Sequence, residues 1–361
     1  MLARILATIL GLVLITTTLQ VSTAFAQQTT ELSTRTVLSK SDWNAQFKLF
    51  YQQELGDTQP CTRQLLGEFK VCSRVLKNEG NAPYILHANN PKAVVVLFHG
   101  LSDSPFFVRS IAEHLQRQNF TVVAPLTPGH GKREADSDMQ DPLLKQRWHQ
   151  HVDEIMTWAQ LAGPDVFSGG FSTGGALATY YILDHPEATK GLLLFSGALQ
   201  LSDNAESMGK IWGMKWISKI VDGEYQTQGA NPFKYPTIAG YSGLVLVDVI
   251  FEIREKIAKL KAQEKAIQLP IFAAHSLSDR TTLYAGVEAL VNSFDGEHSV
   301  FEIDQSYDLC HADVPISSVQ LIAMSFDKSK VKEHEKCAVP QANPLHKQML
   351  DMLDYYLSQN L

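Results

Sequence analysis

Residues 166–175 read Val-Phe-Ser-Gly-Gly-Phe-Ser-Thr-Gly-Gly, and they give the strongest indication of the fold. The apolar residues before Ser172 predict a strand over 165–171, and residues 173–183 are typical of a helix. The serine therefore lies in a G-x-S-x-G pattern at the point where a strand ends and a helix begins. Such a turn is so tight that its flanking positions need small residues, and it raises the serine hydroxyl above the sheet edge. This context favours a nucleophilic serine over a chance match to the pattern.

Short apolar stretches alternate with helical stretches on both sides of this turn. The alternation is typical of a mostly parallel sheet that is covered by helices. Strands are expected at residues 93–98, 120–125, 165–171, 191–196, 269–274 and 300–303. Helices are expected at residues 106–118, 147–162, 173–183, 283–293 and 344–357. Two leading antiparallel strands are expected at residues 69–75 and 82–87.

One segment, residues 198–268, breaks the alternation and reads as helices between two core strands. It is too long for a connecting loop, which favours a helical cap over a site, although part of it must be ordinary core helix. Trp212, Met214 and Trp216 are candidate substrate-binding residues of this cap. The expected segments are a signal peptide (1–26), an extension with the leading strands (27–81), the first part of the core (82–197), the cap (198–268) and the second part of the core (269–361).

A serine hydroxyl is a poor nucleophile at neutral pH, so Ser172 needs a base that a carboxylate orients. Asp279 follows the expected strand 269–274, and His311 comes after a further helix and strand. The carboxyl ends of parallel strands meet at one edge of a sheet, so these side chains are expected beside Ser172. We therefore assign Ser172, Asp279 and His311 as the candidate catalytic residues.

Three other residues compete for these roles. Asp308 could replace Asp279 only by reaching His311 from three residues away, which rarely gives the needed orientation. His298 precedes the last strand, so it is expected at the opposite edge of the sheet. His275 lies on the wrong side of the turn that contains Asp279.

A tetrahedral intermediate also needs amides that point at its oxyanion. Thr173, directly after the nucleophile, and Leu101, in the loop after His99 and Gly100, are the candidate donors. His99 and His130 are interpreted as residues that brace loops.

Composition excludes several classes of protein. The chain has 361 residues, of which 45% are hydrophobic and 19% are charged, as in ordinary globular proteins. Its formal charge of −7 disfavours binding to nucleic acid phosphates, and we find no internal repeat.

The amino terminus has the pattern of a secretory signal peptide. Arg4 precedes an apolar stretch over residues 5–15, and small residues at positions 24 and 26 predict cleavage before Gln27. The alternative is an uncleaved anchor helix, for which the stretch is short against the roughly 20 residues that a span needs.

Export changes the interpretation of the four cysteines, because an even number in an oxidising compartment suggests disulfides. Four cysteines allow three connectivities. The sequence-local choice pairs Cys61 with Cys72 and Cys310 with Cys337, and the alternative is that some are free buried thiols. No spacing resembles a zinc site, so a metal site is disfavoured.

These motifs resemble the α/β-hydrolase superfamily, and within it the monoacylglycerol lipases, lysophospholipases and small bacterial carboxylesterases. The matching residues are His99-Gly100, Pro128-Gly129-His130-Gly131, Gly170 to Gly175, Asp279 and His311. The resemblance implies the α/β-hydrolase fold, with about eight mostly parallel strands flanked by helices, an inserted cap, and no metal or organic cofactor. Phe171 and Ser276 depart from the pattern, because many relatives have His and Gly there.

The expected function is that of an exported serine hydrolase that cleaves carboxylic esters through an acyl-enzyme. Its expected partner is a small-molecule or lipid ester, with transient contact to a membrane surface through the cap and no nucleic acid. The alternatives are an aminopeptidase, a C–C bond hydrolase or a catalytically silent lipid-binding protein.

Overall fold

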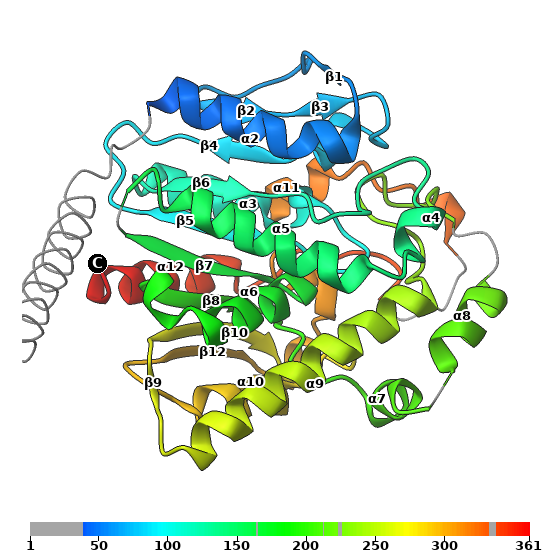
Figure 1. Ribbon diagram of the computed structural model, residues 1–361. Coiled ribbons are helices and arrows are strands. Elements are labelled where there is room, and N and C mark those ends of the chain that lie inside the picture. Colours follow the sequence, from blue (N-terminus) through cyan, green and yellow to red (C-terminus); the bar gives the residue numbers. More distant parts are fainter. Residues whose placement is uncertain (1–38, 164, 212, 223–225, 332–336) are drawn as a thin grey trace, which may run out of the picture. The chain divides into compact units, whose positions relative to one another are not determined.

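An eight-stranded sheet forms the centre of the protein (Figure 1). The computed structural model describes residues 39–163, 165–211, 213–222, 226–331 and 337–361. In spatial order the strands are β12 (Ser299–Ile303), β10 (Ile271–Ser276), β8 (Gly191–Phe195), β7 (Val166–Phe171), β5 (Val94–Phe98), β6 (Thr121–Ala124), β4 (Tyr84–Leu86) and β2 (Glu68–Lys70). Neighbours from β12 to β6 are parallel, whereas β4 and β2 are antiparallel to their neighbours. The expected mostly parallel sheet is therefore confirmed.

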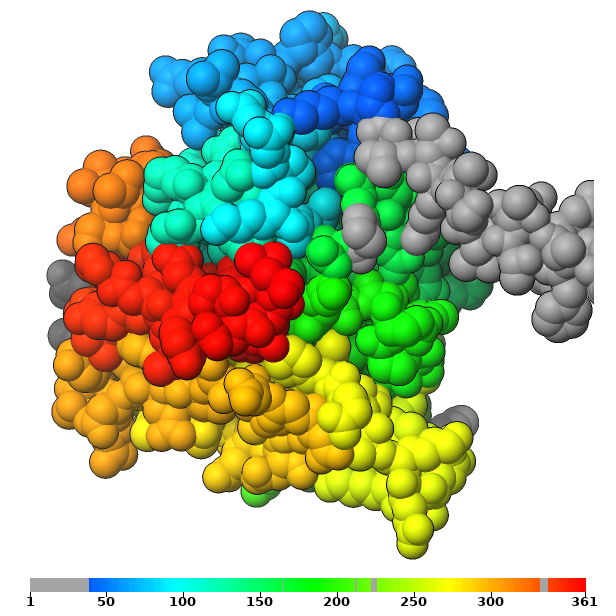
Figure 2. All heavy atoms as spheres, turned by 90° about the vertical axis from the view of Figure 1, so that its left-hand side faces the viewer, coloured from blue at the N-terminus to red at the C-terminus, as the bar shows by residue number. Residues whose placement is uncertain are grey.

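Helices cover both faces of this sheet, which explains why its central strands are apolar throughout. On one face, α5 (Leu144–Ala159), α6 (Thr173–Asp184) and α9 (Gly240–Ala262) contact one another. On the other face, α3 (Arg109–Arg117) and α12 (His346–Gln359) share a buried core with the phenylalanines of the central strands. Figure 2 shows α12 in red at the surface, with the cyan segment around β5 and α3 above it.

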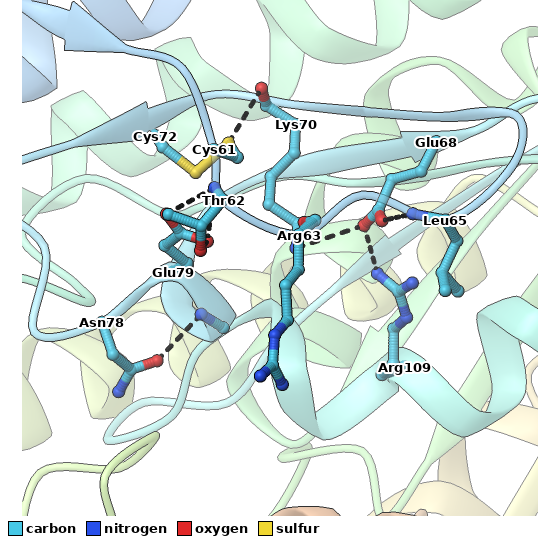
Figure 3. Close-up of a disulfide and its surroundings, with 11 residues drawn as sticks. Cys61, Thr62, Arg63, Leu65, Glu68, Lys70, Cys72, Asn78, Glu79 and Arg109 are labelled. Atoms are coloured by element: carbon cyan, nitrogen blue, oxygen red, sulfur yellow. Dashed lines mark hydrogen bonds and ion pairs between the residues drawn. A yellow bond between two sulfur atoms is a disulfide. The ribbon is translucent and has the colours of Figure 1, made fainter.

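The leading strands differ from the expectation at residues 69–75. Only β2 pairs with β4, and the chain then leaves the sheet, so that β3 (Cys72–Ser73) pairs with β1 (Thr58–Gln59). The Cys61–Cys72 disulfide ties this part of the chain to the preceding loop (Figure 3), which fits its departure from the sheet. Apolar alternation across residues 69–75 does not reveal this break.

The Cys61–Cys72 loop is also held by charged and polar side chains (Figure 3). Glu79 accepts hydrogen bonds from the amide and hydroxyl of Thr62, at 2.8 Å and 2.7 Å. Glu68 forms an ion pair with Arg109 at 2.6 Å, and this connects the loop to α3.

The segment over residues 198–268 divides into two parts. Helices α7 (Asp203–Gly209) and α8 (Met214–Asp222) come first, and α9 follows and packs on α6. Thus α9 belongs to the helical layer on the sheet, while α7 and α8 lie beyond it. Trp212 and the expected signal peptide, residues 1–26, lie outside the described residues.

The remaining elements are short, apart from the amino-terminal helix α2. They are α2 (Lys40–Leu55), α4 (Asp136–Met139), α10 (Tyr284–Val291), α11 (Ser318–Ala323), β9 (Ile267–Gln268) and β11 (Phe294–Asp295), with 3-10 turns at Glu79–Asn81, Pro105–Val108, Pro186–Ala188, Gln305–Tyr307, His311–Asp313 and Lys328–Lys330. Within the described ranges, no helix has the length and apolar character that crossing a membrane requires.

Candidate active site

Ser172 occupies the turn between β7 and α6 in a backbone conformation that few residues adopt. Its φ is 54° and its ψ is −120°, and a positive φ is strained for a residue with a Cβ. Two glycines permit the close packing that holds this turn. A Cβ at Gly170 would lie 2.3 Å from the carbonyl oxygen of Phe98, and one at Gly174 would lie 2.2 Å from it. The structure thus has the tight turn that the pentapeptide predicts.

His311 connects Ser172 to Asp279. Its Nε2 lies 2.9 Å from Oγ of Ser172, and its Nδ1 lies 2.6 Å from Oδ2 of Asp279. The three residues follow β7, β10 and β12, whose carboxyl ends share one edge of the sheet. Because Nδ1 must carry a proton to bond a carboxylate, Nε2 is free to accept the serine proton.

Asp279 is buried and surrounded by donors. The amides of Thr281 and Thr282 donate to its Oδ1, and the Thr282 hydroxyl donates to its Oδ2 at 2.9 Å. Burial alone would raise the pKa of this carboxyl, but attraction to His311 and these hydrogen bonds outweigh it and lower the pKa. Asp279 therefore stays ionised at neutral pH. Thr282 was not among the expected site residues, although a threonine three residues after the acid is a recognisable local pattern.

None of the three competing residues replaces Asp279 or His311 in this series of hydrogen bonds. The carboxylate bonded to His311 is that of Asp279 rather than Asp308. Nδ1 of His298 accepts from the amide of Ile271, at the start of β10 and so at the opposite sheet edge. His275 is buried and bonds the Thr282 carbonyl, and burial lowers its pKa, which keeps it neutral.

Two backbone amides are available beside Ser172. Thr173 is the first residue of α6, where an amide has no partner within the helix. Leu101 follows β5 and lines the same cavity as Ser172. Within the described part of the chain, neither amide donates to a protein acceptor. Both positions suit the developing oxyanion.

The two loop histidines contact the segment that contains Leu101. Nε2 of His99 accepts from the Thr127 amide at 3.0 Å, and its Nδ1 faces the Gly100 carbonyl at 2.8 Å. Nε2 of His130 lies 2.6 Å from the Leu101 carbonyl. Burial lowers the pKa of both imidazoles, so both are neutral. These contacts fit their interpretation as braces.

A cavity of about 930 Å³ opens over Ser172 and His311. One wall is apolar and comes from the 198–268 segment. Its apolar side chains are Leu201, Met208, Ile238, Leu244, Leu246 and Val247.

The expected substrate-binding residues of α8 are not in this wall. Met214 and Trp216 do not line the cavity, and the Trp216 side chain is 70% exposed. The physical reason is the rotation of α8: Lys215 forms an ion pair with Asp248 of α9, which turns Trp216 outward. The apolar residues at the cavity come instead from Leu201, α7, α9 and the chain before α9.

Three charged residues at the cavity were not expected from the sequence. Asp103 is buried in the loop that follows Leu101 and pairs with Lys234 at 3.4 Å. Arg280 is exposed next to Asp279, and no described residue gives its guanidinium an ion pair. Lys234 comes from the 198–268 segment, so no local pattern indicates that it meets Asp103. Among the described residues, no cluster of His, Cys, Asp or Glu is arranged to hold a metal ion.

Comparison with known proteins identifies the family. Residues 89–307 match the family model described as serine aminopeptidase, S33. The chain belongs to this S33 family of hydrolases. One relative, the thermostable monoacylglycerol lipase of Bacillus sp. (strain H-257), is 28% identical over 122 residues. That match covers 34% of this chain and about half of the relative, 47%.

Solved structures with the same fold include lipolytic enzymes. A structure described with the metagenome-derived enzymes LipS and LipT has a TM-score of 0.52 at 18% identity and covers 66% of this chain and 93% of its own. The monoacylglycerol lipase of Paleococcus ferrophilus has a TM-score of 0.50 at 16% identity, and the match covers 76% of this chain and 98% of the lipase. Est1E of Butyrivibrio proteoclasticus, with ferulic acid bound, has a TM-score of 0.50 at 13% identity, and the match covers 77% of this chain and 94% of Est1E. These likenesses establish the α/β-hydrolase fold.

The second disulfide of this S33 hydrolase borders the candidate base. Cys310 pairs with Cys337, as the sequence-local connectivity predicts, and both cysteines line the cavity. Cys310 directly precedes His311, so the disulfide restrains the chain that presents the imidazole.

Replacing both Cys310 and Cys337 by Ser is expected to lower the free energy of unfolding by about 3–4 kcal/mol, from loop entropy alone. It is also expected to slow labelling of Ser172 by a fluorophosphonate, because His311 loses a restraint. Urea denaturation and labelling rates measure the two effects. The matched control, Cys61→Ser with Cys72→Ser, should lose about 3 kcal/mol and keep its labelling rate. Equal labelling in both double variants would contradict the role of Cys310–Cys337.

Asp313, two residues after His311, is a buried carboxyl whose Oδ1 accepts a hydrogen bond from the amide of Gln341 at 3.0 Å. Burial raises its pKa to about 6, against the opposing effects of that hydrogen bond, Lys234 and His311. A raised acid pKa means that the folded protein holds a proton that the unfolded chain releases. Stability is therefore lost as the pH rises from about 4 to 6.

Asp313→Asn removes this ionisation and keeps the acceptor for Gln341. The variant is expected to exceed wild type in unfolding free energy by about 1–3 kcal/mol at pH 8, with the difference much smaller near pH 4. Urea denaturation at both pH values measures it. The same difference at both values would show that the ionisation of Asp313 is not its cause.

Proposed function

We propose that this S33 hydrolase cleaves carboxylic esters, as a carboxylesterase, monoacylglycerol lipase or lysophospholipase does. The observation that carries the proposal is the hydrogen-bonded series Ser172–His311–Asp279 at the wall of a largely apolar cavity. A serine nucleophile disfavours dehalogenation and epoxide hydrolysis, which need an aspartate at this position. The names of the lipase relatives agree with an ester substrate.

Acylation begins when Oγ of Ser172 attacks the acyl carbon and its proton passes to Nε2 of His311. Asp279 remains ionised and stabilises the imidazolium through Nδ1. The amides of Leu101 and Thr173 bind the oxyanion of the tetrahedral intermediate. Collapse of the intermediate expels the alcohol, which takes the proton from Nε2 and leaves an acyl-enzyme.

Deacylation repeats these steps with water. His311 accepts a proton from the water that attacks the acyl carbon, and the same two amides bind the second oxyanion. The proton on Nε2 then returns to Oγ of Ser172 as the carboxylic acid leaves.

The charges at the cavity favour esters over peptides with a free amino terminus. An aminopeptidase needs a carboxylate for the substrate ammonium group, but Asp103 is already paired with Lys234. Arg280 adds a positive charge at the cavity, which repels such a group.

We further propose contact with a membrane surface through α8. The polar face of this helix contacts the protein, and its apolar face is exposed to solvent. Lys215 and Lys219 turn inward, to Asp248 and to the Gln140 carbonyl. Its apolar side chains face solvent, with Ile220 61% and Val221 77% exposed. An exposed apolar face rimmed by polar residues marks a binding surface.

Export is proposed on two grounds. Residues 1–26 have the composition of a signal peptide, and two disulfides suit an oxidising compartment. The activity test therefore uses protein that begins at Gln27.

The activity is tested with p-nitrophenyl esters of two to sixteen carbons. Wild type is expected to hydrolyse them, and Ser172→Ala to lose at least about 10³-fold in kcat. Ser358→Ala, an exposed serine on α12, is the control and should match wild type. Absence of ester hydrolysis would refute the proposal. Fluorophosphonate labelling would then separate a hydrolase of amides or C–C bonds, which is labelled, from a silent lipid-binding protein, which is not.

The membrane contact is tested by sedimentation with phosphatidylcholine vesicles. Ile220→Ser with Val221→Ser is expected to weaken binding about tenfold, because two large side chains lose their burial in lipid. Hydrolysis of a soluble ester should change less than twofold. Val319→Ser with Ile322→Ser removes equally exposed side chains from α11 and serves as the control. Equal binding by the two double variants would exclude α8 as the contact.

A further inference from the structure

We propose that helix α2 is a positioning element of the oxyanion hole, acting through Glu54 and Tyr51. This helix, Lys40–Leu55, precedes the region that matches the family model, residues 89–307. The inference rests on the proposed function, because it assigns a role in stabilising the tetrahedral intermediate. Its basis is a continuous series of hydrogen bonds from α2 to the peptide that bears the Leu101 amide.

Helix α2 is anchored rigidly on the core. The indole of Trp43 stacks on Trp158 of α5 with ring centroids 4.1 Å apart, and its Nε1 donates to the Trp158 carbonyl. Phe47, Tyr51 and Leu55 continue the buried face of the helix. A helix held in this way can fix the position of the side chains at its carboxyl end.

Glu54 holds the turn that follows β6. Its Oε1 accepts a hydrogen bond from the amide of Gly129 at 2.9 Å. Gly129 has a φ of 88°, so this amide is presented by a backbone conformation that suits glycine. Lys132 and Arg147 pair with the same carboxylate at 2.6 Å and 2.8 Å, which fixes its orientation.

Tyr51 holds the other end of the same turn. Its hydroxyl accepts from the amide of Leu126 at 3.0 Å, and its side chain is 1% exposed. Leu126 and Gly129 flank Thr127, so α2 restrains the backbone on both sides of the Thr127 amide.

Thr127 passes this restraint to His99. Because the Thr127 amide donates to Nε2, that nitrogen has no proton, and Nδ1 must carry it. Nδ1 then donates to the Gly100 carbonyl at 2.8 Å. The tautomer of His99 is thus set by the turn that α2 holds.

The Gly100 carbonyl belongs to the same peptide unit as the Leu101 amide. In a trans peptide the C=O and N–H groups point in opposite directions, so fixing the carbonyl also aims the amide. A hydrogen bond to the carbonyl further polarises the peptide and strengthens its N–H as a donor. His130 adds a second restraint from the same turn, through its contact of 2.6 Å with the Leu101 carbonyl.

The test compares two replacements of Glu54. Glu54→Met has similar length but no acceptor for the Gly129 amide, whereas Glu54→Gln keeps an acceptor and loses only the charge. For Glu54→Met we expect kcat and kcat/KM for p-nitrophenyl butyrate to fall about tenfold, with KM within twofold of wild type. The expected decrease is smaller than the loss of about 10²–10³-fold in kcat that follows removal of an oxyanion-hole donor, because the amide is misplaced and not removed. Affinity for a boronic acid, which forms a tetrahedral adduct, should fall by the same factor.

Glu54→Gln should recover most of the lost kcat, because the hydrogen bond to Gly129 is restored. Glu113→Met, which breaks the ion pair with Arg109 on α3, is the matched control for a lost carboxylate. It should change the melting temperature without changing kcat. All assays are run at least 15 °C below each melting temperature, so that unfolding does not contribute.

The outcomes separate this inference from the proposed function. An active wild type with an unchanged kcat in Glu54→Met overturns the role of α2 alone. A loss in Glu54→Gln as large as in Glu54→Met overturns the hydrogen-bond route, because charge and not the acceptor would then matter. A wild type that hydrolyses no ester and takes no fluorophosphonate label refutes the proposed function and this inference together.

Discussion

The structure depends on the close approach of β5 to the turn between β7 and α6. Gly170 and Gly174 lie so near the Phe98 carbonyl that any Cβ would collide with backbone. This contact pairs the end of β7 with the end of β5, where Phe98 lies opposite Gly170. Ser172 and the loop from His99 to Leu101 are consequently neighbours. A side chain at either glycine would move Ser172 and the loop apart.

The same sheet edge gathers residues from distant parts of the chain. Ser172, Asp279 and His311 follow β7, β10 and β12, and parallel strands end together. Burial then determines which of the histidines near this edge are neutral. Burial lowers the pKa of the imidazoles of His99, His130 and His275, so these rings act as neutral hydrogen-bonding groups. His311 instead bonds the carboxylate of Asp279 through Nδ1, at 2.6 Å.

Elements outside the central sheet contribute side chains around Ser172 at this edge. The 198–268 segment supplies the apolar cavity wall, and it also supplies Lys234, which neutralises Asp103. Helix α2 holds the turn after β6 through Glu54 and Tyr51. The 198–268 segment thus lines the cavity over Ser172, whereas α2 bonds the turn that contains Thr127.

Features that depend on near neighbours along the chain can be predicted from the amino-acid sequence. Short patterns predict the turn at Ser172 and place Asp279 and His311 after strand ends. The sequence-local choice among three connectivities gives the pairings Cys61–Cys72 and Cys310–Cys337, which the structure has. Other features are visible only in the folded protein: the direction in which α8 faces, the departure of β3 from the sheet, and the contacts of Lys234 with Asp103 and of Glu54 with Gly129. The two groups of features differ in the distance along the chain over which the responsible interactions act. Steric limits on a turn and the period of a strand act over a few residues, whereas the rotation of a helix and the partner of a buried charge are set by surfaces that meet only after the chain has folded.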